Sequence, residues 1–394
     1  MKKKLLFVME SLGIGGAEKS LVTLLSQLDY SKYEVDLFLF QIKGEFLYLI
    51  PPEVNLLKVP NDFNSFIKNP KESIRDLIKL KKIKLMLYKN VEIINLAFNK
   101  LVLKKEYIGW RFIEKSIDIL EKEYDTAIGF LEKKTIYFIV DKVKAKNKIG
   151  WIHTDYKSIQ FNKGLDKKYL EKLNKIVAVS EPCKESLQEV FPSIKNNIVV
   201  IPNLISDTLI KDMANENIKD FEFTDKILTV CTVGRLTEAK GYDRAIECCN
   251  NLANKGLSFK WIVIGEGSER NKLEKLIAES NLEDRFILLG SRQNPYPYIK
   301  NSDIYVQPSI WEGFGITVSE AKILSKPIVV SNINEFKEQI IEDYTGLIFN
   351  DADEMASKIE MLLSDSELRN KLICNLNNLK IDNREEIEKI NNLF

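Results

Sequence analysis

Two carboxylates, Glu312 and Glu320, bracket a glycine-rich turn that follows a short apolar run ending before Pro308. Helical spacing begins just after the turn, so the segment is predicted to be strand, turn and helix. Backbone N–H groups at a helix start bind anions, and the positive end of the helix dipole strengthens that binding. Acidic residues on both sides suit a ligand with phosphate in the middle and hydroxyls at both ends. The residues of this candidate anion site are Gly313, Phe314, Gly315, Ile316 and Thr317.

Two cations, Arg235 and Lys240, follow the predicted strand Ile227–Val233. Arginine offers a planar fork of donors and lysine a compact point charge, so the pair matches a diphosphate. On spacing alone, alternatives stay open: the cations could belong to a solvated loop, and Glu312 and Glu320 to an ordinary strand, turn and helix.

His153, the only histidine, ends the strand-like run that includes Ile152. Ligands bind at the carboxyl ends of parallel strands, so this position favours a functional role. The alternative is a structural histidine that only makes hydrogen bonds.

The N-terminal loop Gly13–Ser20 lies between a predicted strand and a predicted helix, where phosphate-binding motifs occur. A P-loop needs a second glycine at the position of Glu18, and an anionic side chain there would repel phosphates. The dinucleotide fingerprint also needs a glycine at this position. Both motifs are therefore rejected.

Apolar runs alternate with helical stretches along the chain, which is typical of doubly wound parallel α/β sheets. From Ser73 to about Lys105 the pattern changes to one or two helices rich in Lys, Leu and Ile. The predicted strands are Leu5–Met9, Val35–Phe40, Val54–Val59, Thr126–Phe130, Lys148–Ile152, Ile176–Val179, Ile198–Ile201, Ile227–Val233, Trp261–Ile264, Phe286–Leu289, Ile304–Val306, Ile328–Val330 and Leu347–Phe349.

The 394 residues are enough for two domains of about 200 residues each. Residues 1–200 carry 35 Lys and Arg against 25 Asp and Glu, so the first half is expected to face something anionic. Five cysteines without Cys-x-x-Cys spacing argue against a disulfide framework or a zinc site, and favour a reducing cytoplasm. The run Leu5–Met9 is short for a signal peptide, and no run approaches the ~18 apolar residues of a membrane span. We therefore expect a soluble or peripheral protein.

Four motifs resemble, in their order along the chain, those of the family 4 (group 1) retaining glycosyltransferases of the polysaccharide-biosynthesis type. This family has the GT-B architecture, in which two doubly wound, Rossmann-like parallel-sheet domains face each other across a cleft. The segment Asn332–Glu338 departs from the pattern, because many relatives have a glycine-rich loop there. The four motifs are Gly15-Gly16-Ala17-Glu18, Trp151-Ile152-His153-Thr154-Asp155, Gly234-Arg235-Leu236 with Lys240-Gly241, and Glu312 with Glu320 inside Pro308–Val330.

The resemblance implies an acceptor-binding domain over residues 1–203, to which the last helix, 384–394, returns. It implies a nucleotide-sugar-binding domain over residues 204–383. Glu312 and the loop amides would hold the transferred sugar, the helix start the diphosphate, and Glu320 the ribose.

The same resemblance implies a catalytic set of His153, Glu312, Arg235 and Lys240. His153 would meet the donor sugar and the acceptor, and the two cations would stabilise charge on the leaving diphosphate. The other donor-binding residues would be Gly15 and Gly16, approaching across the cleft, and Gly265, Gly290, Ser291 and Arg292, flanking the nucleobase.

By this resemblance the chain would transfer a sugar from a nucleotide diphospho-sugar, most simply a UDP-sugar, to a hydroxyl of a lipid-linked or glycan acceptor. Neither a cofactor, a metal ion nor nucleic acid is expected to take part. Asp351 and Asp353 could imitate a metal-binding Asp-x-Asp, but they open a helix and helix capping explains them. The alternatives are a sugar-nucleotide epimerase of similar architecture and a glycosyltransferase with a soluble acceptor. A scaffold subunit would have lost Glu320 or the cations, and a phosphorylase would be longer.

The segment Lys71–Lys89 carries seven cations against two acidic residues, interleaved with apolar residues. A basic helix with so much apolar surface is typical of proteins that lie on an anionic membrane. The alternative is a helix packed on the sheet with solvated lysines. We therefore expect a cytoplasmic enzyme that is peripheral at the inner face of the cell membrane.

Overall fold

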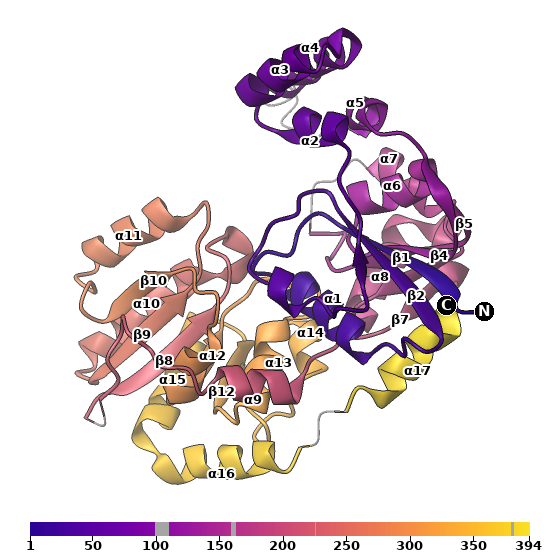
Figure 1. Cartoon of the computed structure of the whole chain (residues 1–394). Coiled ribbons are helices and arrows are strands. Elements are labelled where there is room, and N and C mark those ends of the chain that lie inside the picture. Colours follow the sequence, from indigo (N-terminus) through magenta and orange to yellow (C-terminus); the bar gives the residue numbers. More distant parts are fainter. Residues whose placement is uncertain (99–109, 159–162, 225, 380–381) are drawn as a thin grey trace. The chain divides into compact units, whose positions relative to one another are not determined.

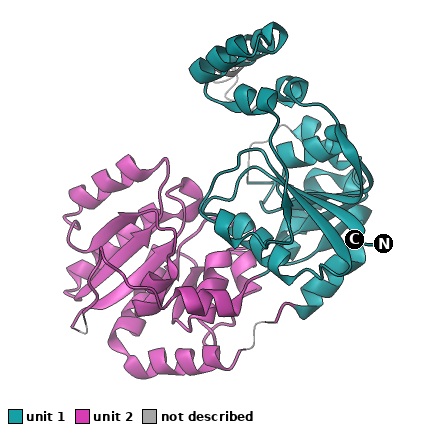
Figure 2. Ribbon diagram, viewed as in Figure 1, with its two compact units in different colours: residues 1–204, 384–394 teal, residues 205–383 magenta. Residues whose placement is uncertain are grey.

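The computed structural model describes residues 1–98, 110–158, 163–224, 226–379 and 382–394. The chain divides into two compact units, which Figure 2 distinguishes by colour. Unit 1 consists of residues 1–204 and 384–394, and unit 2 of residues 205–383. The division predicted from the sequence lies after residue 203.

Unit 1 contains a seven-stranded sheet in the order β3-β2-β1-β4-β5-β6-β7, and every neighbouring pair is parallel. The order reverses between β1 and β4, which is the switch point where such sheets bind ligands. The strands are β1 (Lys3–Met9), β2 (Tyr33–Leu39), β3 (Asn55–Leu56), β4 (Leu120–Gly129), β5 (Val143–Ile152), β6 (Lys175–Ala178) and β7 (Ile198–Val200).

The helices of unit 1 connect these strands, as Figure 1 shows. Ser180 caps α8 by accepting a hydrogen bond from the backbone N–H of Cys183, and Asn69 caps α3 in the same way through Glu72. The described α-helices are α1 (Gly16–Gln27), α2 (Asn61–Ile67), α3 (Pro70–Lys79), α4 (Ile83–Phe98), α5 (Trp110–Ile113), α6 (Lys134–Lys142), α7 (Lys163–Leu170), α8 (Glu181–Val190) and α17 (Arg384–Leu393).

Unit 2 repeats the same topology with six parallel strands in the order β10-β9-β8-β11-β12-β13. Its switch point lies between β8 and β11. The strands are β8 (Leu228–Val233), β9 (Phe259–Ile264), β10 (Phe286–Gly290), β11 (Ile304–Gln307), β12 (Ile328–Ser331) and β13 (Leu347–Phe349).

Two apolar layers pack against the sheet of unit 2, because its strands are buried on both faces. One layer includes Trp261 and α10, and the other includes Tyr305 and α13. The α-helices of unit 2 are α9 (Asp207–Met213), α10 (Tyr242–Asn254), α11 (Arg270–Glu279), α12 (Tyr296–Asn301), α13 (Ile316–Ile323), α14 (Asn334–Lys337), α15 (Ala352–Ser364) and α16 (Ser366–Asn377).

The last helix, α17, belongs to unit 1. Ile390 is fully buried, and the ring of Phe394 lies 5.9 Å from that of Phe7 and 5.8 Å from that of Tyr33, measured between centroids. Since Phe7 lies on β1 and Tyr33 on β2, the end of the chain completes the core beside the first two strands.

The basic segment forms two helices, α3 and α4, which lie side by side at one end of unit 1 (Figure 1). Lys81, in the turn between them, has a positive φ of 55°. The end of the predicted helical stretch, residues 99–105, lies outside the described residues. No helix within the described ranges is long and apolar enough to cross a membrane.

Candidate active site

The loop after β8 places one unpaired cation and one paired cation at the switch point of unit 2. Arg235 is exposed, and its guanidinium makes no hydrogen bond or ion pair within the described part of the chain. The ammonium of Lys240 forms a short ion pair with Oε1 of Glu312, and both side chains are mostly buried. Because Lys240 follows β8 and Glu312 follows β11, the pair spans the point where the strand order reverses.

The loops after β8 and β11 are held close by their backbones. The N–H of Ile310 donates to the carbonyl of Ala239 at 2.8 Å. A Cβ added at Gly241 would lie 2.2 Å from the carbonyl oxygen of Pro308, and its φ of 64° also favours glycine. Glycine at position 241 is therefore needed for the close approach that joins Lys240 to Glu312.

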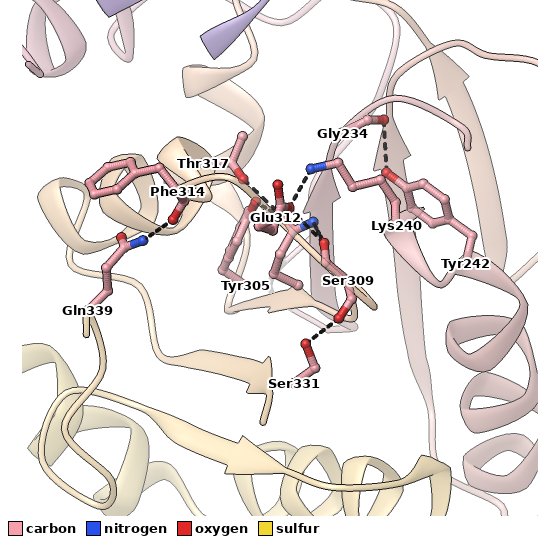
Figure 3. Close-up of polar contacts among 11 residues, drawn as sticks. Gly234, Lys240, Tyr242, Tyr305, Ser309, Glu312, Phe314, Thr317, Ser331 and Gln339 are labelled. Carbon is pink, nitrogen blue, oxygen red and sulfur yellow. Dashed lines mark hydrogen bonds and ion pairs between the residues drawn. The ribbon is translucent and has the colours of Figure 1, made fainter. Parts of the chain in front are cut away.

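A chain of hydrogen bonds from buried polar residues holds the carboxylate of Glu312, as Figure 3 shows. The hydroxyls of Tyr305 (2.7 Å) and Thr317 (3.2 Å) donate to Oε1 of Gln307, whose Nε2 donates to Oγ of Ser309 at 2.9 Å. The hydroxyl of Ser309 then donates to Glu312 at 2.8 Å. The network therefore holds the side chain of Glu312 in one orientation.

The glycine-rich turn presents the N-terminus of α13 without a side-chain cap. Gly315 has a φ of 78°, and a Cβ there would lie 2.5 Å from the ring of the buried residue Phe336. Gln339 donates a hydrogen bond to the carbonyl of Phe314 and so supports the turn from below (Figure 3). The first N–H groups of α13 and its dipole therefore provide an anion site next to Thr317 and Glu312.

Glu320 lies deeper than the proposed ribose contact requires. Its side chain is on α13, the residue is 1% exposed, and Oε1 accepts a hydrogen bond from the hydroxyl of Tyr296 at 3.1 Å. A sugar hydroxyl could reach this carboxylate only after a local shift of the turn or of Tyr296.

The four residues expected to flank the nucleobase follow β9 and β10. The N–H of Gly265 donates to the carbonyl of Gly290 at 3.0 Å, and Gly290 has a φ of 80°. Ser291 is exposed. The guanidinium of Arg292 is engaged elsewhere, because its Nε donates to Oδ2 of Asp220 at 2.7 Å and to the hydroxyl of Tyr298 at 3.3 Å. Arg292 thus ties the loop after β10 to Asp220 and leaves Arg235 as the uncompensated cation of this site.

In unit 1, His153 directly follows β5, as expected. The residue is partly exposed, but both ring nitrogens are buried and make no hydrogen bond with any described residue. The ring of Phe130 lies beside it, 5.3 Å away between centroids. Burial lowers the pKa of His153 to about 3, and the backbone of Phe130 offsets this only in part. The imidazole is therefore neutral near pH 7, with an unused donor and an unused acceptor.

Glu132 is a neighbour of His153 that the sequence did not point out. It follows β4, and its Oε2 accepts a hydrogen bond from the backbone N–H of His153 at 3.2 Å. Burial raises the pKa of the Glu132 carboxyl, and nearby Asp166 adds to this, whereas the bond from His153 opposes it. Lys133, the next residue, has a φ of 68°, which is strained for a residue other than glycine.

The N-terminal glycines lie at the switch point of unit 1, where α1 begins at Gly16. Gly15 is extended, with a φ of −158°, and the carboxylate of Glu18 lies where a Cβ of Gly15 would be. Lys134 after β4 forms an ion pair of 3.3 Å with Glu10 after β1, and so spans this switch point.

No group of acidic, histidine or cysteine side chains in the described residues could hold a metal ion. The capping interpretation of the Asp-x-Asp segment is confirmed, because Asp351 accepts a hydrogen bond of 2.9 Å from the backbone N–H of Glu354.

The residues missed by sequence reasoning are buried polar partners. Gln307 and Ser309 are fully buried on and after β11, and Tyr296 is 4% exposed. The available signal was Gln307 itself, a polar residue that ends an otherwise apolar strand. Glu132 and Tyr296 gave no such signal, because their roles depend on contacts far apart in sequence.

The chain thus consists of two Rossmann-type units, and unit 2 has an uncapped helix start and two cations at its switch point. Residues 213–378 match the family of glycosyl transferases group 1. An Anabaena HepE structure in complex with UDP-glucose has a TM-score of 0.70 and 16% identity, and covers 99% of this chain and 98% of that one. The fold is therefore GT-B.

Two curated relatives place the match in the context of whole proteins. An N-acetylgalactosamine-N,N'-diacetylbacillosaminyl-diphospho-undecaprenol 4-alpha-N-acetylgalactosaminyltransferase of Campylobacter jejuni is 23% identical and aligns over 93% of this chain and 92% of its own length. An uncharacterized glycosyltransferase of Methanocaldococcus jannaschii is 32% identical over 44% of each chain. With the latter, the chain spans less than half of the relative's length. The family match lies within unit 2, and together with the fold these similarities support a group 1 glycosyltransferase.

Proposed function

We propose that the chain transfers a sugar from a nucleotide diphospho-sugar, most simply a UDP-sugar, to a hydroxyl of a lipid-linked or glycan acceptor in cell-surface polysaccharide biosynthesis. The observation that carries this proposal is the ion pair between Lys240 and Glu312 across the switch point of unit 2, beside the unpaired Arg235 and the uncapped start of α13. The complex of the Anabaena protein with UDP-glucose supports the choice of uridine.

In the proposed reaction the bond between the anomeric carbon and the β-phosphate oxygen breaks. The acceptor oxygen forms the new bond on the same face of the sugar, so the configuration is retained. Its proton moves to the departing phosphate, and no group of the protein is consumed. In unit 2 the donor-binding set would consist of Arg235, Lys240, Gly265, Gly290, Ser291, Arg292, Gly313, Phe314, Gly315, Ile316, Thr317 and Glu320.

Electrostatics is the main task of these residues. Arg235, the start of α13 and Lys240 would stabilise the negative charge that develops on the diphosphate. Glu312, held by Ser309 and Lys240, would accept hydrogen bonds from hydroxyls of the transferred sugar. These fixed cations can take the place of a divalent ion, so we propose a reaction without metal.

Unit 1 would receive the acceptor. His153 offers a neutral imidazole with two unused nitrogens at the end of β5, which suits a hydroxyl that both donates and accepts. Gly15 and Gly16 would approach the donor from this unit. We propose that the acceptor is lipid-linked and that the enzyme works as a peripheral protein at the cytoplasmic face of the membrane.

The test is a screen of sugar nucleotides for release of the nucleoside diphosphate, with a lipid-diphosphate-linked acceptor, with a soluble glycan, and without acceptor. We expect acceptor-dependent release and a new glycosidic bond of retained configuration. Arg235→Ala should abolish release, whereas Lys275→Ala, an exposed lysine on α11, should not change it. An altered sugar nucleotide formed without acceptor would instead establish an epimerase.

A further inference from the structure

The helix α4 exposes an apolar stripe to solvent and buries an ion pair beside Leu85 on its inner face. Its solvent face carries Ile83, Leu87 and Ile94, which are 67%, 56% and 68% exposed. At 100° per residue these positions fall within about 40° of one another, on one stripe. Its opposite face buries Lys89 and Glu92, which form an ion pair of 2.8 Å with only 8% and 5% of their side chains exposed.

This arrangement needs an explanation, because a buried ion pair is a weak source of stability and an apolar stripe in water is a cost. The pair neutralises itself, so the inner face of α4 can pack on α2, where the ammonium of Lys89 lies over the ring of Phe66 at 5.1 Å. The outer face is left for an apolar partner.

The turn between α3 and α4 continues the apolar surface. Ile78, at the end of α3, is 59% exposed, and Leu80, in the turn, is 39% exposed. Leu77, by contrast, is fully buried and belongs to the core of unit 1. The exposed apolar residues of this hairpin, which we call the hairpin tip, are Ile78, Leu80, Ile83, Leu87, Val91 and Ile94.

Uncompensated cations surround the hairpin tip. Lys79, Lys81 and Lys84 are exposed and form no ion pair with any residue in the described ranges. Two nearby cations are compensated: Lys82 pairs with Asp62 at 2.6 Å, and Lys68, which precedes α3, pairs with Asp76 at 2.7 Å. Three free cations therefore lie at the turn between α3 and α4, beside Ile78, Leu80 and Ile83.

We propose that the hairpin tip inserts into an anionic lipid bilayer, with its aliphatic side chains among the acyl chains and Lys79, Lys81 and Lys84 at the headgroups. Aliphatic residues ringed by unpaired lysines fit this partner, since a lysine near an anionic surface favours binding roughly fivefold. A second copy of the chain would bring the same lysines together and repel itself. The inference deepens the proposed function by naming the surface that would bring unit 1 to a lipid-linked acceptor, but vesicle binding does not depend on that function.

The experiment is sedimentation of the full chain with vesicles of phosphatidylcholine, with and without phosphatidylglycerol, in the absence of donor and acceptor. We expect binding to the anionic vesicles only, and weaker binding at high salt. Two triple variants should each lose at least about tenfold in binding. These are Ile83→Ser with Leu87→Ser and Ile94→Ser, and Lys79→Glu with Lys81→Glu and Lys84→Glu.

Matched controls come from exposed residues of unit 2. Ile341→Ser with Tyr344→Ser and Met361→Ser removes apolar side chains that are 61%, 44% and 49% exposed, and should leave binding unchanged. The triple variant Lys272→Glu, Lys275→Glu and Lys371→Glu reverses the same number of charges and should keep most of the vesicle binding. All the hairpin positions changed are exposed, so circular dichroism should show folded variants.

Absence of wild-type binding to anionic vesicles, or equal binding to neutral ones, would overturn the inference. Wild-type vesicle binding by the serine variant would also overturn it. If that variant in addition turned a dimer into a monomer, the partner of the hairpin tip would be a second copy of the chain. Binding of UDP to the full chain would remain measurable in each case, so failure of this inference is distinguishable from failure of the proposed function.

Discussion

At the scale of single residues, the two cations after β8 differ in their partners: the guanidinium of Arg235 is unpaired in the described chain, whereas the ammonium of Lys240 pairs with Glu312. Arg235 and Lys240 were expected just after β8, which is where they lie. Arg292 remains a predicted nucleobase contact, and the structure adds that its guanidinium donates to Asp220 and Tyr298. Sequence spacing determines which strand a residue follows. The ion pair of Arg292 instead depends on Asp220, which is 72 positions away in the sequence.

Replacement of Arg235, Lys240 or Glu320 by alanine should each lower kcat/KM by at least about a hundredfold, or ~2.7 kcal/mol of transition-state stabilisation. Arg235→Ala should do so without loss of stability, because its side chain is exposed and unpaired in the described chain. Lys240→Ala also leaves the mostly buried Glu312 without its cation and should lower the free energy of unfolding. The double variant with Glu312→Gln should regain that stability. Near wild-type kinetics in two of the three single variants would refute the site.

His153 and Glu132 should give the stability of unit 1 opposite dependences on pH. His153 has a folded pKa of about 3 against an ordinary 6.5, so between these values the unfolded chain binds more protons and stability falls as the pH falls. Glu132 has a raised pKa, so its contribution is present at low pH and is lost as the pH rises through that value.

Urea unfolding between about pH 5 and pH 7 measures both effects. His153→Phe should flatten the rise of stability with pH, and Glu132→Gln should steepen it. An unchanged slope in His153→Phe would show that the imidazole is not buried in its neutral form.

Among the elements, the strands were predictable because buried parallel strands are short apolar runs bounded by Gly, Pro or polar residues. The end helix, predicted over Arg384–Leu393, is α17. The predicted strand Val54–Val59 is reduced to Asn55–Leu56, because β3 is an edge strand with one neighbour. The segment Asn332–Glu338 forms α14, whose Phe336 packs under the glycine-rich turn.

Gly315→Ala should destabilise unit 2 and weaken donor binding, because a Cβ meets both a positive φ and the buried ring of Phe336. The control is Gly256→Ala, since Gly256 has a nearly equal φ of 81° and nothing within 4 Å of its Cβ. The control should lose about 1 kcal/mol for the backbone alone. Gly315→Ala should lose a further ~1–3 kcal/mol for overpacking. Equal losses in thermal unfolding would mean that the turn gives way without strain.

Across the whole molecule, the charge distribution predicted an anionic partner but did not show which surface would bind it. The excess of 35 basic over 25 acidic residues in positions 1–200 indicated an anionic partner, but it did not locate one. Ion pairs cancel Lys68, Lys82 and Lys89, and only the structure shows which lysines remain. The structure is also needed to distinguish buried from exposed apolar residues, since Leu77 and Leu85 face the core while Leu87 faces solvent.

Turnover should persist without divalent ions, because fixed cations and the start of α13 would supply the charge that a metal would otherwise provide. The measurement is initial rate after treatment with EDTA, and again after addition of magnesium or manganese. Rates should agree throughout. Loss with EDTA and recovery with either ion would show that the fixed cations are not sufficient.

Calorimetric titration of UDP into the full chain tests whether unit 2 binds a nucleoside diphosphate at the switch point between β8 and β11. We predict saturable binding of one UDP per chain without added metal, lost in Arg235→Ala and kept in Lys275→Ala. The absence of UDP binding by the wild-type chain, or binding that Arg235→Ala leaves unchanged, would refute a nucleotide site at this switch point.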